Sequence, residues 1–329
     1  MNNLFQEILL CETCPQVDVI NDENEEIVKS HLANTHSGVS VTAFIIALRT
    51  EERQWLQDVY DEAKDYLDDN FPTKFLRHFE QCAWELCTYK YLRENEIDIY
   101  LPERDAGPDF DTSIGYVECI AVTRGLKANA IPIMQASVLR EDGTFDPDIS
   151  FEPVPTNAIK LRISAGMSEK IRKYTGYETE EWFNHSKPRV IALNWNAEGA
   201  VMVSDSRSIA TNAGLQTLFG TGYSEIVIDT ETHEVIKERL TREPVLTNVN
   251  NSPIDVGYFA KEPENDESRI DGVIMSSKWP GSYDSTNFRA VNNPFAEGID
   301  LDAIAIGLKT YATLDEDGRG ISLDTFPHS

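Results

Sequence analysis

Our prediction of the fold starts from the stretch FLRHFEQCAWELCTYKYLREN, residues 75–95. Its apolar residues recur at helical spacing and charged residues fill the other positions, which is typical of a helix that packs one face on a core. After a polar break, GPDF at 107–110 leads through a short loop into the apolar run YVECIAV at 116–122. We therefore expect a helix, a turn and a buried strand, each of which delivers one acid: Glu85, Asp109 and Glu118.

The third of these acids lies in an unfavourable place. Glu118 has apolar neighbours on both sides, and a carboxylate inside a buried strand is costly to desolvate unless it is paired, protonated or bound to a cation. Oxygen ligands from Asp109 and Glu118 would form a half-shell that suits Mg²⁺, which keeps several waters and takes one or two protein carboxylates. Two simpler readings remain open: Pro-Asp is an ordinary turn signal, and Glu118 could be an edge-strand acid that faces solvent.

These motifs carry a family resemblance. The order of WEL at 84–86, GPDF at 107–110 and VECIA at 117–121 resembles the core of the PD-(D/E)xK nuclease superfamily, which has the restriction-endonuclease-like fold. It is similar to a group of bacterial proteins with a WEL helix, a GPDF turn and an IE-x-x-A strand, and VNNPFAEG at 291–298 resembles a segment near the end of that group. The resemblance covers about residues 75–298.

The resemblance implies an α/β fold with a mixed central sheet flanked by helices, and a nuclease that hydrolyses DNA or RNA. It implies that Asp109 and Glu118 bind Mg²⁺ or Mn²⁺ and that Glu85 supports them. Such a metal orients a phosphodiester, neutralises its developing charge and lowers the pKa of an attacking water. The pattern departs at one position, because Ile120 stands where the superfamily has a lysine two residues after the second acid.

A lysine from elsewhere in the chain is a candidate to replace it. On a helix predicted over residues 157–175, Lys170 falls inside the apolar stripe, and a lysine on a buried face needs an anion. Lys170 is therefore the candidate for the charge that polarises the nucleophilic water or the phosphate. A lysine whose stem covers apolar surface while its ammonium reaches solvent is the equal alternative. Arg124 and Lys127, in a long loop predicted over 122–155, either face phosphate or decorate the loop.

The first 38 residues are expected to form a zinc unit. Cys11, Cys14, His31 and His36 give the spacing C-x2-C-x16-H-x4-H, in which the cysteines follow a strand-like run, FQEILL, and the histidines lie on a predicted helix over 24–36. Thiolates and imidazoles suit tetrahedral Zn²⁺. A unit this small has too little core to fold alone, so a bound metal would stabilise it. We expect a ββα-like unit of C2H2 type at 1–38, before a nuclease domain at 39–329; the alternative is an incidental C-x2-C beside two surface histidines. The acidic helix favours a structural or protein-contact role over reading DNA.

Three further apolar runs, at 189–195, 225–230 and 271–277, predict strands that join the 117–122 strand in the mixed sheet. A second charged helix is predicted over 50–71, packed beside the 75–94 helix.

Net charge opposes the nuclease interpretation. The 329 residues include 56 acids and 29 bases, a formal charge of -27, whereas nucleic-acid affinity comes mostly from lysine and arginine. Bases clustered in one cleft, bridging divalent cations or a basic partner subunit would resolve the conflict. High salt tolerance would also explain an acidic surface. No apolar run of 18 residues and no basic region followed by an apolar stretch occurs, so we expect a cytoplasmic protein without a membrane span.

Three functions fit the sequence. A metal-dependent nuclease would use the acids and Lys170 in restriction, repair or phage defence. A catalytically inactive relative would keep the fold as a binding or scaffold module, which Ile120 and the acidity favour. An acidic DNA mimic would need none of the metal acids.

Overall fold

The computed structural model describes residues 3–9, 22–101, 107–123, 156–195, 212–232, 235–243, 245–248, 252–259, 270–278, 283–296, 299–314 and 321–327. Four residues singled out by the sequence lie outside these ranges: Cys11, Cys14, Arg124 and Lys127. Most of the loop predicted over 122–155 lies outside them as well.

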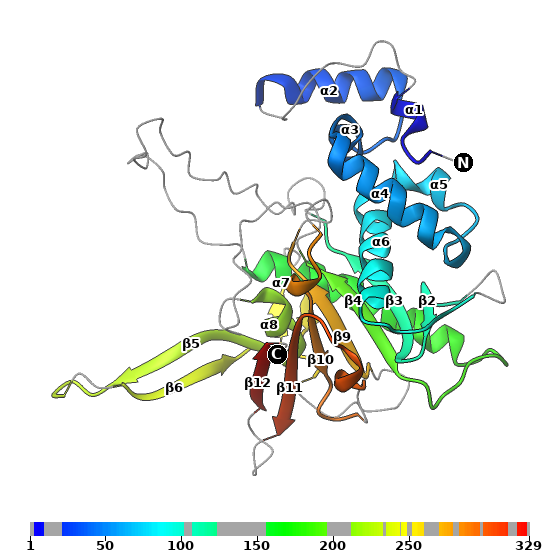
Figure 1. The fold of residues 1–329 in the computed structure, drawn as a ribbon. Coiled ribbons are helices and arrows are strands. Elements are labelled where there is room, and N and C mark those ends of the chain that lie inside the picture. Colours follow the sequence, from blue (N-terminus) through cyan, green and yellow to red (C-terminus); the bar gives the residue numbers. More distant parts are fainter. Residues whose placement is uncertain are drawn as a thin grey trace.

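An eight-stranded mixed sheet forms the centre of the described part of the chain (Figure 1). In sheet order its strands are β1 (Ile99–Tyr100), β2 (Phe110–Thr112), β3 (Gly115–Ala121), β4 (Arg189–Asn194), β9 (Gly272–Ser276), β10 (Arg289–Asn292), β11 (Leu308–Leu314) and β12 (Ile321–Pro327). The central neighbours β3, β4 and β9 are parallel, as are β10 and β11, and the other pairs are antiparallel. The predicted α/β class with a mixed sheet flanked by helices is confirmed.

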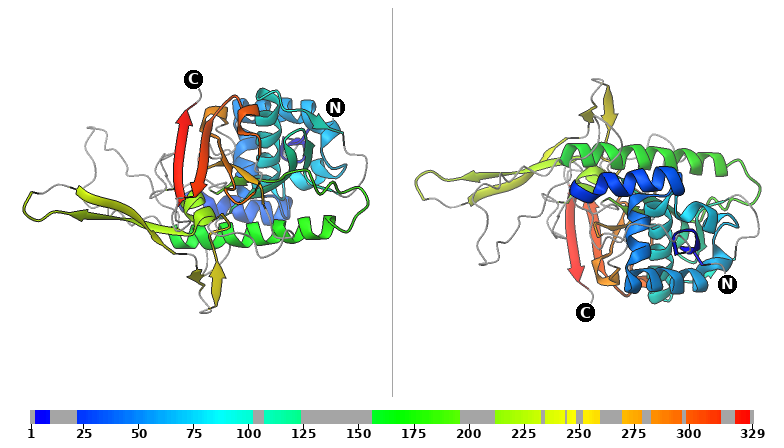
Figure 2. Two further views of the ribbon diagram at one scale, coloured as in Figure 1. Left: turned by 90° about the horizontal axis from the view of Figure 1, so that it is seen from below. Right: turned by 90° about the horizontal axis from the view of Figure 1, so that it is seen from above.

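Helices cover both faces of this sheet (Figure 2). One side carries α3 (Val41–Leu48), α4 (Thr50–Ala63), α5 (Phe71–Phe75) and α6 (Phe79–Glu94), and the other carries α7 (Thr156–Tyr177) and α8 (Ala213–Phe219). Alternation along β3 sends Val117 and Cys119 into the core beneath α6, and Tyr116 and Ile120 into the core beneath α7. Burial on both faces explains why these central strands read as nearly continuous apolar runs.

Helix α6, which the sequence predicts over residues 75–94, is more deeply buried than its charge pattern indicates. Buried residues occur all round α6, and Trp84 donates a hydrogen bond from Nε1 to the Ala192 carbonyl of β4 at 2.9 Å. The cause is a second layer of helices, because α3, α4 and α5 pack on the side of α6 that faces away from the sheet. The helix predicted over 50–71 is α4 followed by a short 3₁₀ turn, η1 (Lys64–Tyr66). Two further 3₁₀ turns are η6 (Ser285–Asn287) and η7 (Leu301–Ala303).

The strand predicted near the N-terminus is wrong. Residues Gln6–Leu9 of the FQEILL run form a helical turn, α1, whereas the helix predicted over 24–36 is confirmed as α2 (Asp22–Thr35). Phe5 and Ile8 are buried, and the Phe5 ring meets the Phe75 ring of α5 at 5.2 Å. Apolar residues at this spacing pack well from a helical turn, so the tertiary contact decides the local structure. The predicted boundary at residue 38 stays a prediction.

One predicted strand lies outside the central sheet. The run at 225–230 belongs to β5 (Thr221–Ile228), which pairs with β6 (Val235–Arg242) in a two-stranded arm that projects from the body (Figure 1). A short connection lets these two strands pair locally, and an apolar run does not specify which strand it will join. Lys160 of α7 anchors the base of the arm, with Nζ 2.5 Å from Glu243 Oε2 and 3.1 Å from the Thr221 carbonyl. A second hairpin follows, β7 (Val245–Thr247) and β8 (Pro253–Asp255).

None of the helices in the described ranges combines the length and the apolar character needed to cross a bilayer.

The close approach of α7 to β3 generates a stability prediction. A Cβ added to Gly166 would lie 2.7 Å from Ile120 Cγ2, so Gly166→Ala should lower the free energy of unfolding even though alanine is about 1 kcal/mol better than glycine in a helix. In an Ile120→Ala background, where the branched side chain is gone, the same change should cost less or stabilise. We expect a coupling of about 1–3 kcal/mol in urea denaturation.

The control lies on the same helix. Nothing is within 4 Å of a Cβ added at Gly176, so Gly176→Ala should stabilise by about 0.5–1 kcal/mol. Additive effects of the Gly166 and Ile120 changes would contradict the tight packing of α7 on β3.

Candidate active site

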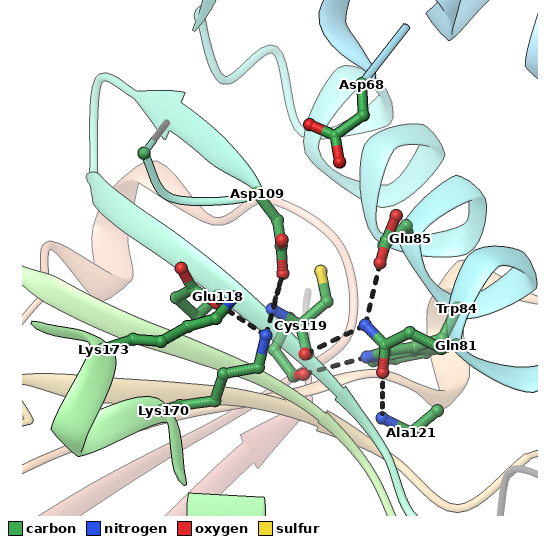
Figure 3. A network of polar contacts seen from close by, with 12 residues as sticks. Asp68, Gln81, Trp84, Glu85, Asp109, Glu118, Cys119, Ala121, Lys170 and Lys173 are labelled. Atoms are coloured by element: carbon green, nitrogen blue, oxygen red, sulfur yellow. Dashed lines mark hydrogen bonds and ion pairs between the residues drawn. The ribbon is translucent and has the colours of Figure 1, made fainter. Parts of the chain in front are cut away.

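Glu118 is a fully buried carboxylate in the middle of β3. It lies on the same face of the strand as Ile120, which packs beneath α7. Three side chains of α7 meet it. Lys170 Nζ lies 2.6 Å and Lys173 Nζ 3.1 Å from Oε2 (Figure 3). The Tyr177 hydroxyl lies 2.8 Å from Oε1. The buried charge is therefore compensated, and the alternative of a solvent-facing edge acid does not hold.

Asp109 reaches the same point from the turn before β2. Its Oδ2 accepts a hydrogen bond from the Cys119 amide at 2.6 Å and lies 3.4 Å from Lys170 Nζ (Figure 3). The ladder between β2 and β3 starts at the pair Phe110 and Val117, so the Asp109 carboxylate bonds an amide of β3 that lies beyond that ladder. The structure thus brings Asp109 and Glu118 together on one ammonium group, and the metal that the sequence predicts between them stays a prediction.

Lys170 is on the buried face of α7, as its place in the apolar stripe of that helix predicts. It is buried, and its neighbours in the stripe, Ile163, Met167 and Tyr174, are buried as well. Its ammonium lies against two carboxylates, so the alternative of a lysine that reaches solvent is wrong. Ile120, the position where the family has its lysine, instead packs against Gly166, about one turn before Lys170.

The charges around Lys170 decide its protonation. Burial alone would lower the pKa of Lys170, but the nearby charges of Asp109 and Glu118 outweigh it and raise that pKa above the ordinary lysine value. Burial raises the pKa of Glu118 and the Asp109 charge adds to this, while Lys170 and Lys173 oppose it. Lys170 therefore acts as a fixed positive charge and not as a proton acceptor.

Glu85, the predicted supporting acid, belongs to a neighbouring network on α6. Gln81 Nε2 donates to Glu85 Oε1 at 2.9 Å and to the Cys119 carbonyl at 3.1 Å, and Gln81 Oε1 accepts from the Ala121 amide at 3.1 Å (Figure 3). The Gln81 side chain thus satisfies the edge of β3 where β2 has ended. Burial raises the pKa of Glu85 to about 8, with the Asp109 charge adding to the effect, so this carboxyl is mostly protonated at neutral pH.

The acids form a pair and not a triad. Within the described residues, no three Asp, Glu, His or Cys side chains gather closely enough to hold a metal ion. Asp109 and Glu118 nevertheless both face one cation, the Lys170 ammonium, and two carboxylates completed by waters are a donor set that Mg²⁺ accepts. The pair therefore fits a single hard divalent ion, which would compete with Lys170 for the same oxygens.

Of the four predicted zinc ligands, the two histidines are among the residues that the structure describes. The rings of His31 and His36 have centroids 5.7 Å apart, and His36 is buried with Nδ1 3.5 Å from Glu7 Oε1. Two imidazoles that share one ion through Zn–N bonds of about 2.0–2.1 Å would have a similar ring separation. Because Cys11 and Cys14 lie outside the described residues, the zinc unit stays a prediction.

Sequence reasoning missed three side chains of the site. These side chains are Lys173, Tyr177 and Gln81. A signal was available for two of them, since Tyr177 follows Lys170 by seven residues and Gln81 precedes Glu85 by four, spacings that put each pair on one helical face.

The chain matches no protein-family model, no curated protein and no solved structure. The resemblance to PD-(D/E)xK nucleases accordingly stays a prediction.

The raised pKa of Glu85 predicts a pH dependence of stability. A carboxyl whose pKa is raised on folding binds its proton more tightly in the folded state, so the free energy of unfolding should fall as pH rises from about 4.3, the unfolded value, to about 8. Glu85→Gln keeps an acceptor for Gln81 but does not titrate, so this fall should be weaker in the variant. Urea denaturation from pH 5 to pH 9 measures it.

Glu80→Gln, on the same helix, is the control for the loss of one charge, and it should leave the pH dependence as in the wild type. An unchanged slope in Glu85→Gln would contradict the proposed burial of this carboxyl.

Proposed function

We propose that this chain is a divalent-metal-dependent nuclease with a restriction-endonuclease-like fold that hydrolyses phosphodiester bonds of DNA or RNA. The observation that carries the proposal is the convergence of Asp109 and Glu118 on the ammonium of Lys170. Metal-assisted phosphodiester hydrolysis needs carboxylates that hold the ion and a positive charge near the phosphate, and these three side chains would supply both. The mixed sheet and the order of the motifs along the chain support the fold assignment.

Each side chain has a distinct role in this proposal. Asp109 and Glu118 would hold Mg²⁺ or Mn²⁺, which supplies Lewis acidity and a water of lowered pKa. Lys170 keeps its proton and offsets the negative charge that develops on the phosphate. Glu85, with a pKa of about 8, is the neighbouring carboxyl that exchanges a proton near neutral pH.

The distribution of bases answers the objection from net charge. The 22 residues of α7 include five bases, Lys160, Arg162, Lys170, Arg172 and Lys173, and one acid, Glu169. Arg172 is exposed, and the Lys173 side chain is 41% exposed while it contacts Glu118. In a chain of charge -27, the helix that carries Lys170 and Lys173 is therefore positive, and phosphates would approach along it.

The alternative is a catalytically inactive protein that uses the same fold for binding. Its support is the charge balance of the cluster, because Lys170 and Lys173 offset Asp109 and Glu118 without a metal. Ile120 in the family's lysine position points the same way. Under either function, the N-terminal unit with structural Zn²⁺ would serve contact with a protein partner in a cytoplasmic setting such as restriction, repair or phage defence.

Plasmid cleavage separates the two functions. With Mg²⁺ or Mn²⁺ the wild type should nick plasmid DNA or cleave RNA, and Asp109→Ala should abolish this because one of two metal ligands is lost. Lys170→Met should lower kcat by about 10²–10³, the usual effect of removing one group that stabilises transition-state charge. Circular dichroism and denaturation of each variant control for folding. A wild type that binds Mn²⁺ or nucleic acid but never cleaves either substrate would favour the inactive protein.

The positive helix predicts a salt-dependent binding defect. In an Asp109→Ala background, Arg172→Glu should weaken the binding of a fluorescent oligonucleotide and reduce the slope of log K against log salt by about 1 or more, because one phosphate contact is lost. Arg93→Glu makes the same charge change at the exposed end of α6, on the other face of the sheet, and should have a smaller effect. Equal effects of the two variants would contradict an approach along α7.

A further inference from the structure

The hydroxyl of Tyr177, in the last turn of α7, touches two separate parts of the site. It lies 2.6 Å from the carbonyl oxygen of Gly107 and 2.8 Å from Oε1 of Glu118. Gly107 begins the turn that carries Asp109, and Glu118 is in the middle of β3. A single phenol therefore connects the backbone that presents one carboxylate with the other carboxylate itself.

We propose that Tyr177 is a positioning residue whose hydroxyl holds the 107–109 turn against β3 and thereby fixes the separation of the Asp109 and Glu118 carboxylates. Its consequence for catalysis rests on the proposed function, whereas the tether itself is a property of the metal-free protein.

Within the described residues, the tether adds a contact to a turn that the pairing of β2 with β3 does not reach. The ladder between β2 and β3 covers three residue pairs and begins at Phe110, so residues 107–109 lie beyond it. The hydrogen bond from the Cys119 amide fixes the Asp109 carboxylate, and the Tyr177 hydroxyl meets the turn two residues earlier. Two contact points on either side of Pro108 restrain both the position and the direction of the turn.

The chemistry of the phenol suits this role. A phenol keeps its proton at neutral pH, so the hydroxyl is available as a donor. A phenol has one proton and donates to one acceptor at a time, so the Gly107 carbonyl and the Glu118 carboxylate share it. Replacing the hydroxyl would deprive both groups of this donor.

The ring is placed independently of the hydroxyl. Its centroid lies 6.1 Å from the Tyr174 ring in an edge-to-face arrangement and 5.4 Å from the Trp182 ring. Tyr177→Phe therefore keeps the aromatic packing and removes the tether alone.

A matched control lies three residues earlier on the same helix. The Tyr174 hydroxyl lies 2.7 Å from each of two backbone carbonyls, those of Tyr116 in β3 and Val190 in β4. Tyr174→Phe thus also removes a hydroxyl that is shared between two acceptors. Here both acceptors are strand carbonyls, and neither the 107–109 turn nor a carboxylate is contacted. It should lower stability without loosening the 107–109 turn.

The first measurement is amide hydrogen exchange by NMR on the metal-free full-length protein. In Tyr177→Phe the Cys119 amide, which donates to Asp109, should exchange about tenfold faster or more through local opening, because the turn that presents its acceptor is freed. In Tyr174→Phe the Cys119 amide should change only as far as global stability does. Wild-type exchange at Cys119 in Tyr177→Phe would overturn the proposal.

The second measurement is Mn²⁺ binding by calorimetry together with the kinetics of cleavage. Tyr177→Phe should weaken Mn²⁺ binding about 10–100-fold, the usual effect of losing a group that orients metal ligands, and should lower kcat more than it changes KM. Equal Mn²⁺ affinities of Tyr177→Phe and Tyr174→Phe would overturn the positioning role. If the wild type takes up no Mn²⁺ while Tyr177→Phe still exchanges faster at Cys119, the tether is supported and the proposed nuclease function fails.

Discussion

The buried ion pair between Glu118 and Lys170 is the interaction on which the arrangement of α7 and β3 depends. A carboxylate at the centre of a sheet has lost its water, and the removal of one partner from a buried ion pair typically costs about 3–5 kcal/mol. The ammonium must therefore reach the middle of β3. This requirement sets both the position of α7 along the strand and its distance from the strand. Gly166 allows that approach, because any larger residue there would meet Ile120. Packing and electrostatics thus specify the same helix position.

The same pair explains why the two glutamates of the site have different surroundings. Burial raises the pKa of Glu118, while the charges of Lys170 and Lys173 oppose that rise. Glu85 has a glutamine for its close partner, so burial and the Asp109 charge raise its pKa to about 8. Carboxyl groups with shifted pKa values are common at functional sites, although ion-pair networks of purely structural purpose also perturb pKa values. A buried ion pair is itself weak evidence of stabilisation, since an apolar replacement is often as stable.

Much of this arrangement follows from periodicity in the sequence. Alternation along β3 predicts that Glu118 and Ile120 share a face, and the stripe on α7 predicts that Lys170 turns inward and needs an anion. Both signals are local, because each depends only on spacing within one element. The predictions that failed needed knowledge of which other segment the run would contact. The run at 225–230 joins a separate arm, and the FQEILL run is helical because Phe5 packs on Phe75. Spacing alone contains neither fact.

Under the proposed function, the conflict between an acidic chain and an anionic substrate is a question of distance. Charges separated by more than about 8–10 Å at physiological salt are largely screened, so a phosphate at the site responds to nearby groups and not to the sum over the surface. Those groups are Lys170 and Lys173, which are paired with Asp109 and Glu118, and Arg172, which is exposed on the same helix. The remaining acids slow the approach from afar without cancelling attraction at contact. Net charge therefore bears on the rate and salt dependence of association, whereas under the proposed function the bases of α7 would hold a phosphate once it arrives.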